Sequence, residues 1–196
     1  MVDHPEPIRA LSLIVDALEQ VGAPYALGGS VASSYFGEPR TTMDIDLLVE
    51  LDAGGLNELL AVLGDEVYVP EEAARLALRR RASFNVLHHD TGHEIDVFVS
   101  GAGLLDQEQL RRRREVLISD QPELRAWMTA PENIVLRKLD WHRRAGGSDR
   151  QWRDVLGVLK EQGGRLDLDY LQRVGRESGL EASLGEALEQ AGLGDA

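Results

Sequence analysis

The spacing of hydrophobic residues divides the chain into a mixed first part and a helical second part. Apolar side chains recur at intervals of three and four over 8–21, which predicts an amphipathic helix. Apolar and polar residues alternate over 43–50 and 93–100, which predicts strands, because strand side chains point to opposite faces in turn. From Leu104 onward helical spacing dominates, with candidate helices at 105–115, 131–144, 149–162, 168–178 and 180–191.

Shorter segments complete an α+β fold. Apolar runs predict further strands at 24–27, 67–69 and 83–89, with helices between the strands at 30–36, 55–63 and 71–81. The pattern breaks near 119–131, so we expect an α/β domain over residues 1–122 and a helical domain over 123–196. The expected architecture is a mixed β-sheet flanked by helices and followed by a C-terminal helical domain.

Composition narrows the available chemistry. The chain has no cysteine, so thiolate metal sites and cysteine nucleophiles are excluded. Its net charge is −13, with 6 basic and 17 acidic residues over 1–100, and a duplex-coating nucleic-acid binder would instead be basic throughout. The balance reverses to 11 basic and 8 acidic residues over 101–153, where a phosphate-bearing partner would bind. No run reaches the ~18 apolar residues of a membrane span, so we expect a cytoplasmic protein without a membrane partner.

Two aspartates in one strand provide the first candidate site. Asp44 and Asp46 are two residues apart, so their carboxylates project from the same face and repel each other unless a cation lies between them. Asp96 also lies mid-strand between apolar neighbours. Oxygen ligands without sulfur or paired histidines favour Mg²⁺ or Mn²⁺. For each single aspartate a salt bridge, for example to Arg40, is an equally good explanation, whereas the three together favour a metal site.

A glycine turn precedes this strand. Gly28 and Gly29 have no Cβ, so a phosphate can approach the backbone, and the helix that follows presents unpaired N–H groups at its first turn. Ser30 adds a hydroxyl group. Most Gly-Gly-Ser turns are only turns, so this one indicates a phosphate site only together with the neighbouring motifs.

Taken together, these motifs resemble the nucleotidyltransferase fold of the DNA polymerase β superfamily. The resemblance lies in Leu27-Gly28-Gly29-Ser30, a gap of thirteen residues, Met43-Asp44-Ile45-Asp46-Leu47 and the later Ile95-Asp96-Val97. The segment from Arg40 to Asp46 is similar to the bacterial branch that contains abortive-infection and toxin–antitoxin nucleotidyltransferases. The resemblance implies that Asp44, Asp46 and Asp96 are the catalytic metal ligands and that Gly28, Gly29 and Ser30 hold nucleotide phosphates.

The resemblance extends into the helical part. The segments 132–139 and 149–154 look like the later motifs of this branch, in which a helix lysine and a downstream Arg/Asp segment complete the nucleotide site. By matching position, Lys138 is the expected triphosphate contact and Asp154 a supporting residue, and Arg40 is a further candidate phosphate ligand. A solvent-exposed lysine whose stem packs on the surface is the alternative for Lys138. The branch often has Lys-Asp where this chain has Arg153-Asp154, which leaves the nucleotide contact there open.

The resemblance implies transfer of a nucleoside monophosphate from a nucleoside triphosphate to a hydroxyl group. The acceptor is left open between an RNA such as tRNA, a protein and a small molecule, and a toxin-like role follows by analogy only. Two alternatives remain: an aminoglycoside-type small-molecule nucleotidyltransferase, which the acidic first half would suit, and a non-catalytic binding or antitoxin module that keeps the fold.

Overall fold

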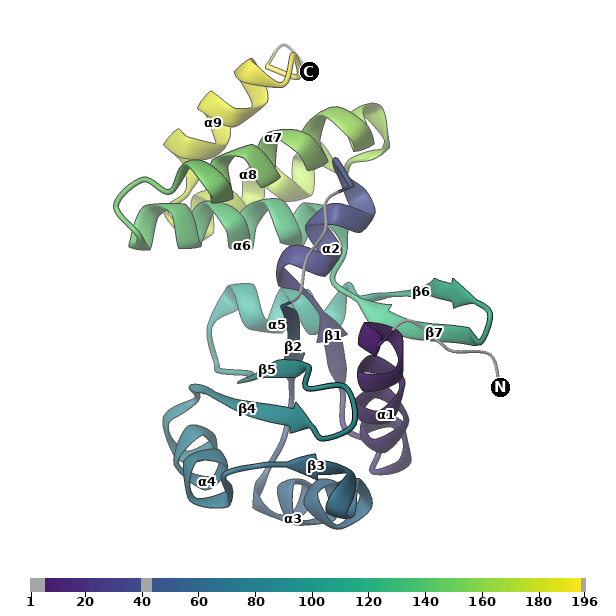
Figure 1. The fold of residues 1–196 in the computed structure, drawn as a ribbon. Coiled ribbons are helices and arrows are strands. Elements are labelled where there is room, and N and C mark those ends of the chain that lie inside the picture. Colours follow the sequence, from purple (N-terminus) through teal and green to yellow (C-terminus); the bar gives the residue numbers. More distant parts are fainter. Residues whose placement is uncertain (1–5, 40–43, 195–196) are drawn as a thin grey trace.

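The computed structural model describes residues 6–39 and 44–194, and within them seven strands form one mixed sheet (Figure 1). The strand order is β3-β4-β5-β2-β1-β7-β6. β2 runs parallel to β5 and β1 parallel to β7, while the other neighbours are antiparallel. The strands are β1 (Tyr25–Leu27), β2 (Ile45–Val49), β3 (Val67–Tyr68), β4 (Ser83–His88), β5 (Glu94–Val99), β6 (Arg114–Asp120) and β7 (Glu123–Met128).

The central strands have one apolar face and one mixed face. The apolar side chains of β2 and β5 pack in a single core with α1 (Glu6–Gln20), α3 (Ala53–Leu63) and α4 (Glu71–Arg80). The opposite face carries Asp46 and Leu48 on β2 and their register partners Asp96 and Phe98 on β5. Helix α5 (Leu104–Arg111) covers part of this face by packing Leu110 against Leu48 and Phe98. Because strand side chains alternate between the two faces, Asp46 and Asp96 lie on the face opposite the apolar core, which is the face that α5 partly covers.

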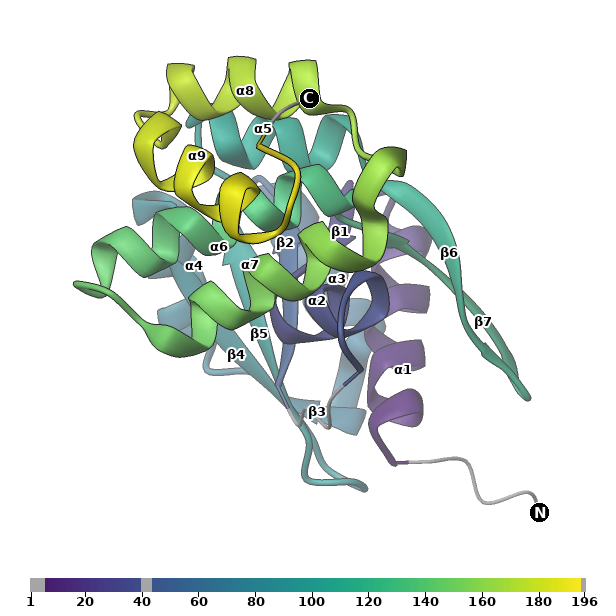
Figure 2. The same ribbon diagram turned by 90° about the horizontal axis from the view of Figure 1, so that it is seen from above.

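Four helices form a layer beside the sheet, which Figure 2 shows from above. They are α6 (Pro131–Arg144), α7 (Asp149–Gln162), α8 (Leu168–Glu177) and α9 (Glu181–Gln190). Helix α2 (Gly29–Phe36) leads from the sheet into this layer and contacts both α6 and α7. Gly37 caps the end of α2, and an added Cβ there would lie 2.8 Å from the backbone nitrogen of Val158 on α7. The end of α2 therefore packs directly against α7. Two short 3₁₀ turns, η1 (Gly64–Glu66) and η2 (Gly163–Arg165), follow α3 and α7.

Two expectations about the second half are wrong. The helix predicted over 105–115 ends at Arg111, and the next segment is the β6–β7 hairpin, which projects from the body in both ribbon views (Figures 1 and 2). The sheet therefore continues to Met128, and the helical part begins at Pro131 rather than at residue 123. The change from helix to strand is not visible in the sequence pattern, because the run of four arginines at 111–114 begins in the helix and ends in the strand. The other predicted helices and strands are present with small differences at their ends.

None of the helices in the described residues has the length and apolar character that a membrane span requires.

Candidate active site

The turn between β1 and α2 is built around the side chain of Asp46. The backbone N–H of Gly28 donates to the Asp46 carbonyl oxygen over 2.9 Å, and the N–H of Ser30 donates to Asp46 Oδ2 over 3.3 Å. Gly29 has φ +51°, and an added Cβ there would lie 1.7 Å from Asp46 Oδ2. Only glycine fits this position, since both the backbone conformation and the neighbouring carboxylate exclude a side chain. The predicted glycine turn and the predicted Asp-x-Asp strand are thus parts of one structure.

Asp96 lies beside Asp46, because the two residues are register partners on parallel strands. Burial raises the pKa of the Asp46 carboxyl, the Ser30 N–H donor and the Lys138 charge oppose that rise, and the charge of Asp44 adds to it. Burial also raises the pKa of Asp96, and the neighbouring charge of Asp46 raises it further. The charge of Asp46 therefore disfavours the charged form of Asp96, and a cation between the two carboxylates would reverse that effect.

Asp44 lies immediately before β2, two residues from Asp46, and 60% of its side chain is exposed. Arg150, on α7, approaches Asp44 with an Nη2–Oδ2 distance of 3.7 Å, and the same nitrogen donates to Ser30 Oγ over 3.1 Å. The Arg150 guanidinium thus connects Asp44, just before β2, with Ser30 in the turn between β1 and α2. The sequence motif around residues 149–154 pointed to this helix but not to Arg150, whose contact depends on how α7 packs against α2.

Lys138 is buried, with 2% of its side chain exposed, so it is not a solvent-exposed lysine on the surface of α6. Its ammonium lies 2.7 Å from Asp154 Oδ2, and Ser33 Oγ donates to the same carboxylate oxygen over 3.4 Å. The Lys138 charge also acts on Asp46. The lysine and Asp154 therefore form an ion pair between α6 and α7 that also contacts Ser33 on α2.

The predicted site also includes Arg40 and a cluster of three aspartates. Arg40 lies outside the described residues. Within residues 6–39 and 44–194, no three aspartate, glutamate or histidine side chains are grouped as a metal site. The charges of Asp44 and Asp46 raise the pKa of Asp96, and the role of the three aspartates as metal ligands stays a prediction.

Solved structures share the fold over almost the whole chain. The antibiotic-resistance factor ANT(2'')-Ia aligns with a TM-score of 0.58 at 15% identity, covering 93% of this chain and 97% of that one. An antigenic nucleotidyltransferase-like protein from Paracoccidioides brasiliensis aligns with a TM-score of 0.54 at 16% identity, covering 94% and 92%. The fold is that of the nucleotidyltransferases. No protein-family model and no curated protein sequence matches the chain.

A second structure of ANT(2'')-Ia, in complex with adenylyl-2''-tobramycin, aligns with a TM-score of 0.55 at 15% identity, covering 89% of this chain and 99% of that one. At identities this low, the alignments show that the nucleotidyltransferase fold is shared and do not show that the activity is shared. The fold class expected from the sequence is thereby confirmed, whereas the toxin–antitoxin branch is not shown.

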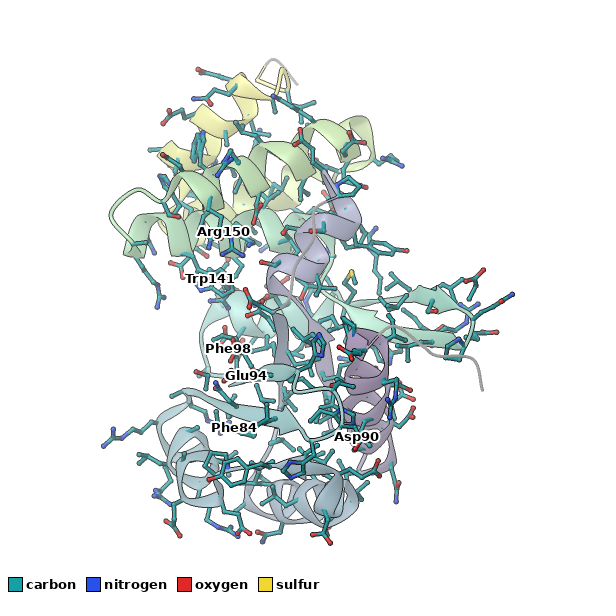
Figure 3. All side chains as sticks on the ribbon, in the orientation of Figure 1. Phe84, Asp90, Glu94, Phe98, Trp141 and Arg150 are labelled. Carbon is teal, nitrogen blue, oxygen red and sulfur yellow. The ribbon has the colours of Figure 1, made fainter. Side chains whose placement is uncertain are left out.

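In this nucleotidyltransferase fold, a cleft of about 630 Å³ opens between the sheet and the helical layer. Gly28, Gly29 and Asp46 line it, together with Phe98 on β5 and Trp141 on α6. The two ring centroids are 6.3 Å apart, and Figure 3 shows both residues where the layers meet. The cleft is large enough for a nucleotide or a similar ligand beside the acidic strand.

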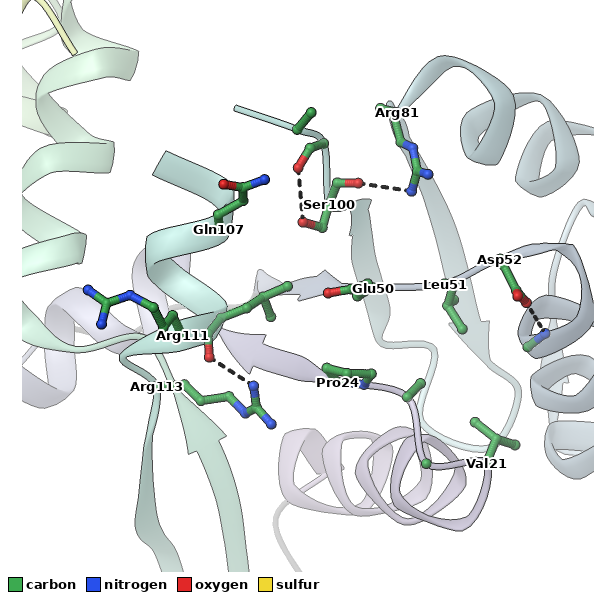
Figure 4. Close-up of a pocket in the computed structure, with 16 residues that line it drawn as sticks. Val21, Pro24, Glu50, Leu51, Asp52, Arg81, Ser100, Gln107, Arg111 and Arg113 are labelled. Atoms are coloured by element: carbon green, nitrogen blue, oxygen red, sulfur yellow. Dashed lines mark hydrogen bonds between the residues drawn. The ribbon is translucent and has the colours of Figure 1, made fainter. Parts of the chain in front are cut away.

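A larger hollow, of about 870 Å³, lies at the other end of the sheet (Figure 4). Glu50 and Ser100 line it directly after β2 and β5, whereas Asp46 and Asp96 are near the beginnings of these strands. It contains none of the site residues predicted from the sequence. The candidate site therefore remains the smaller cleft, which Gly28, Gly29 and Asp46 line.

Proposed function

We propose that the protein is a Mg²⁺-dependent nucleotidyltransferase that moves a nucleoside monophosphate from a nucleoside triphosphate to a hydroxyl group. The observation that carries the proposal is the pairing of Asp46 with Asp96 beside a glycine turn that has no room for a side chain. Adjacent, partly buried carboxylates are costly unless they bind a cation, and a glycine turn at a helix N-terminus suits phosphate.

The donor set fits a hard divalent cation. Asp44, Asp46 and Asp96 supply carboxylate oxygens only, which suits Mg²⁺ or Mn²⁺, and burial raises the pKa values of Asp46 and Asp96 in the absence of such a charge. When bound, the metal would neutralise triphosphate charge and lower the pKa of the acceptor hydroxyl.

The phosphate side of the site would come from the other elements. The N–H groups at the beginning of α2 and the hydroxyl of Ser30 face the acidic strand, and Arg150 already contacts Ser30 and Asp44. Lys138 adds a buried positive charge, held by Asp154. Arg40 remains a candidate by its position in the sequence. These cations would hold the triphosphate and stabilise the charge on the departing pyrophosphate.

The reaction forms one bond and breaks one. The acceptor oxygen attacks the α-phosphorus, the bond from that phosphorus to the bridging oxygen breaks, and pyrophosphate leaves. Asp96 would receive the proton of the acceptor hydroxyl, since its carboxylate lies beside Asp46 on the neighbouring strand. No covalent enzyme intermediate is required.

A small-molecule acceptor is the second candidate. ANT(2'')-Ia, which shares the fold, has been solved with adenylyl-2''-tobramycin, an adduct of an aminoglycoside, and the acidic first half of this chain would suit a cation. RNA such as tRNA and protein acceptors are the others, and the similarity of residues 40–46 to toxin-type nucleotidyltransferases adds a toxin-like role to the proposal.

A labelling experiment tests the reaction. The protein is incubated with each α-labelled nucleoside triphosphate, Mg²⁺ and cell extract, in parallel with Asp46→Asn and the exposed control Asp65→Asn. We expect label on an acceptor with the wild type and the control, and none with Asp46→Asn. Absence of label with every nucleotide, or equal labelling by Asp46→Asn, would favour the non-catalytic binding module instead.

A further inference from the structure

The larger hollow, at the end of the sheet away from the acidic pair, is lined by two arginines that only neutral groups hold in place. Arg81 Nη1 donates to the carbonyl oxygen of Ser100 over 3.0 Å, and Arg113 Nη1 donates to that of Leu110 over 2.8 Å (Figure 4). Among the residues that the structure describes, neither guanidinium forms an ion pair with a carboxylate. A carbonyl oxygen fixes one N–H of a group that has five, and the positive charge of each arginine is left uncompensated.

The backbone of Arg81 is in an unfavourable conformation. Arg81 follows α4 with φ +51° and ψ +50°, and in the described part of the chain it is the one residue other than glycine with positive φ. This helix-ending position usually carries glycine, because a Cβ is disfavoured in the left-handed region. Such strain is typically kept where the side chain has a function. The position of its guanidinium in the hollow provides that function.

Most other charges of the hollow are used within the protein. Arg111 pairs with Glu108, which does not line the hollow, at an Nη2–Oε2 distance of 2.5 Å. Asp52 caps α3, since its Oδ1 accepts a backbone N–H of that helix over 2.8 Å. Glu50 is the remaining carboxylate in the lining, and it is exposed to solvent. Two uncompensated guanidinium groups against one exposed carboxylate favour an anionic ligand.

Helix α5 lies between the hollow and the cleft that contains the candidate active site. Gln107 and Leu110 of this helix line the hollow, whereas Leu105 and Gln109 line the cleft. Arg81 lines both. A ligand in the hollow would therefore be separate from the acidic pair, and would contact a residue that also belongs to the wall of the cleft.

We propose that the hollow is a second ligand site, which takes a small molecule with carboxylate or phosphate groups. The planar guanidinium fork binds two oxygens of either group at once, which suits such ligands better than halide ions. With a volume of about 870 Å³, the hollow has room for a molecule of metabolite size. The proposal concerns binding at the hollow and does not depend on the proposed reaction.

Two variants remove the arginines, and a third is the control. Arg81→Gly removes the guanidinium and suits the left-handed backbone, so it should weaken binding without lowering the melting temperature. Arg113→Gln removes the second charge. Arg176→Gln is the matched control, because Arg176 pairs with Glu181 on the surface and lines neither the hollow nor the cleft.

The first measurement is isothermal titration calorimetry with citrate and, separately, with inorganic pyrophosphate, at low salt and without divalent cations. We expect at least one probe to bind, and Arg81→Gly and Arg113→Gln each to raise its Kd about tenfold. Tighter binding of citrate would identify a carboxylate ligand, and tighter binding of pyrophosphate a phosphate ligand. Arg176→Gln should bind as the wild type does. Binding of neither probe, or the same Kd for all three variants, would overturn the proposal.

The second measurement separates the hollow from the candidate active site. Asp46→Asn and Arg150→Gln should leave the Kd of the probe unchanged, because neither residue lines the hollow. Weaker binding by Arg150→Gln together with unchanged binding by Arg113→Gln would place the probe at the glycine turn and overturn the second site. Arginine-dependent binding in the hollow without nucleotidyl transfer to any acceptor would support the second site and contradict the proposed reaction.

Discussion

Asp46 and Asp96 occupy paired positions on the parallel strands β2 and β5, and the first of them also accepts the N–H of Ser30. This relationship joins three segments that are distant in the sequence. It places Asp46 at the N-terminus of α2, where the helix dipole favours negative charge and where a triphosphate would bind.

Replacing Gly29 by alanine should abolish transfer and destabilise the protein. The new Cβ would overlap Asp46 Oδ2 and would adopt an unfavourable positive φ, at a cost of about 1–3 kcal/mol from the backbone alone. Gly64 is the matched control, because it has φ +52° and no atom within 4 Å of an added Cβ. Gly64→Ala should lose stability but keep activity. Equal transfer rates for the two variants would show that the Gly29–Asp46 contact is not part of the site.

Arg150→Gln should raise KM for the nucleoside triphosphate. The variant removes a charged donor that contacts both Ser30 and Asp44, and charge-assisted hydrogen bonds contribute about 1.5–3 kcal/mol, so kcat/KM should fall about tenfold or more. Lys160→Gln, an exposed position near the end of the same helix, is the control. Steady-state kinetics with both variants decide the matter, and an equally small effect of each would remove Arg150 from the site.

Lys138 and Asp154 should separate stability from activity. Lys138→Met leaves the Asp154 carboxylate without its closest cation, which should cost about 3–5 kcal/mol of unfolding free energy. Adding Asp154→Leu should restore part of that stability, since the buried charge is then gone. Activity should not return, because the positive charge near Asp46 is still missing. Denaturant unfolding and transfer rates of the single and double variants test this, and a fully active double variant would limit the pair to a structural role.

The sequence predicted the residues of the acidic face, and could not predict how they meet. Strand alternation is a local property, so the common face of Asp44 and Asp46 follows from their spacing. The pairing of Asp46 with Asp96 depends on which strands are neighbours, and the contacts of Arg150 depend on how α7 packs on α2. The β6–β7 hairpin was missed although Leu124, Ala126 and Met128 alternate as buried residues, because the preceding arginines continued the helical pattern.

The acidic pair should make the metal-free protein more stable at low pH than at neutral pH, relative to a variant that lacks one member. The folded-state pKa values of Asp46 and Asp96 are raised above the ordinary value of 3.8, so their contribution is fully present below that value and is lost as pH rises through the folded pKa. Asp96→Asn should therefore be more stable than the wild type at pH 7 without divalent cations.

Unfolding free energies of the wild type and Asp96→Asn, measured from below pH 3.8 to pH 7, give the difference in stability directly. Mg²⁺ with a nucleoside triphosphate should stabilise the wild type more than the variant, because the ligand binds the folded state. A variant that is less stable than the wild type at pH 7 would mean that the two carboxylates do not repel each other.

Binding of Mn²⁺ followed by electron paramagnetic resonance tests the central claim most directly, with a non-hydrolysable nucleoside triphosphate analogue present. The wild type should bind Mn²⁺ in a complex with the analogue, and Asp46→Asn and Asp96→Asn should each lose most of that binding while they remain folded. Unchanged Mn²⁺ binding in both variants would contradict the assignment of these aspartates to a metal-dependent nucleotide site.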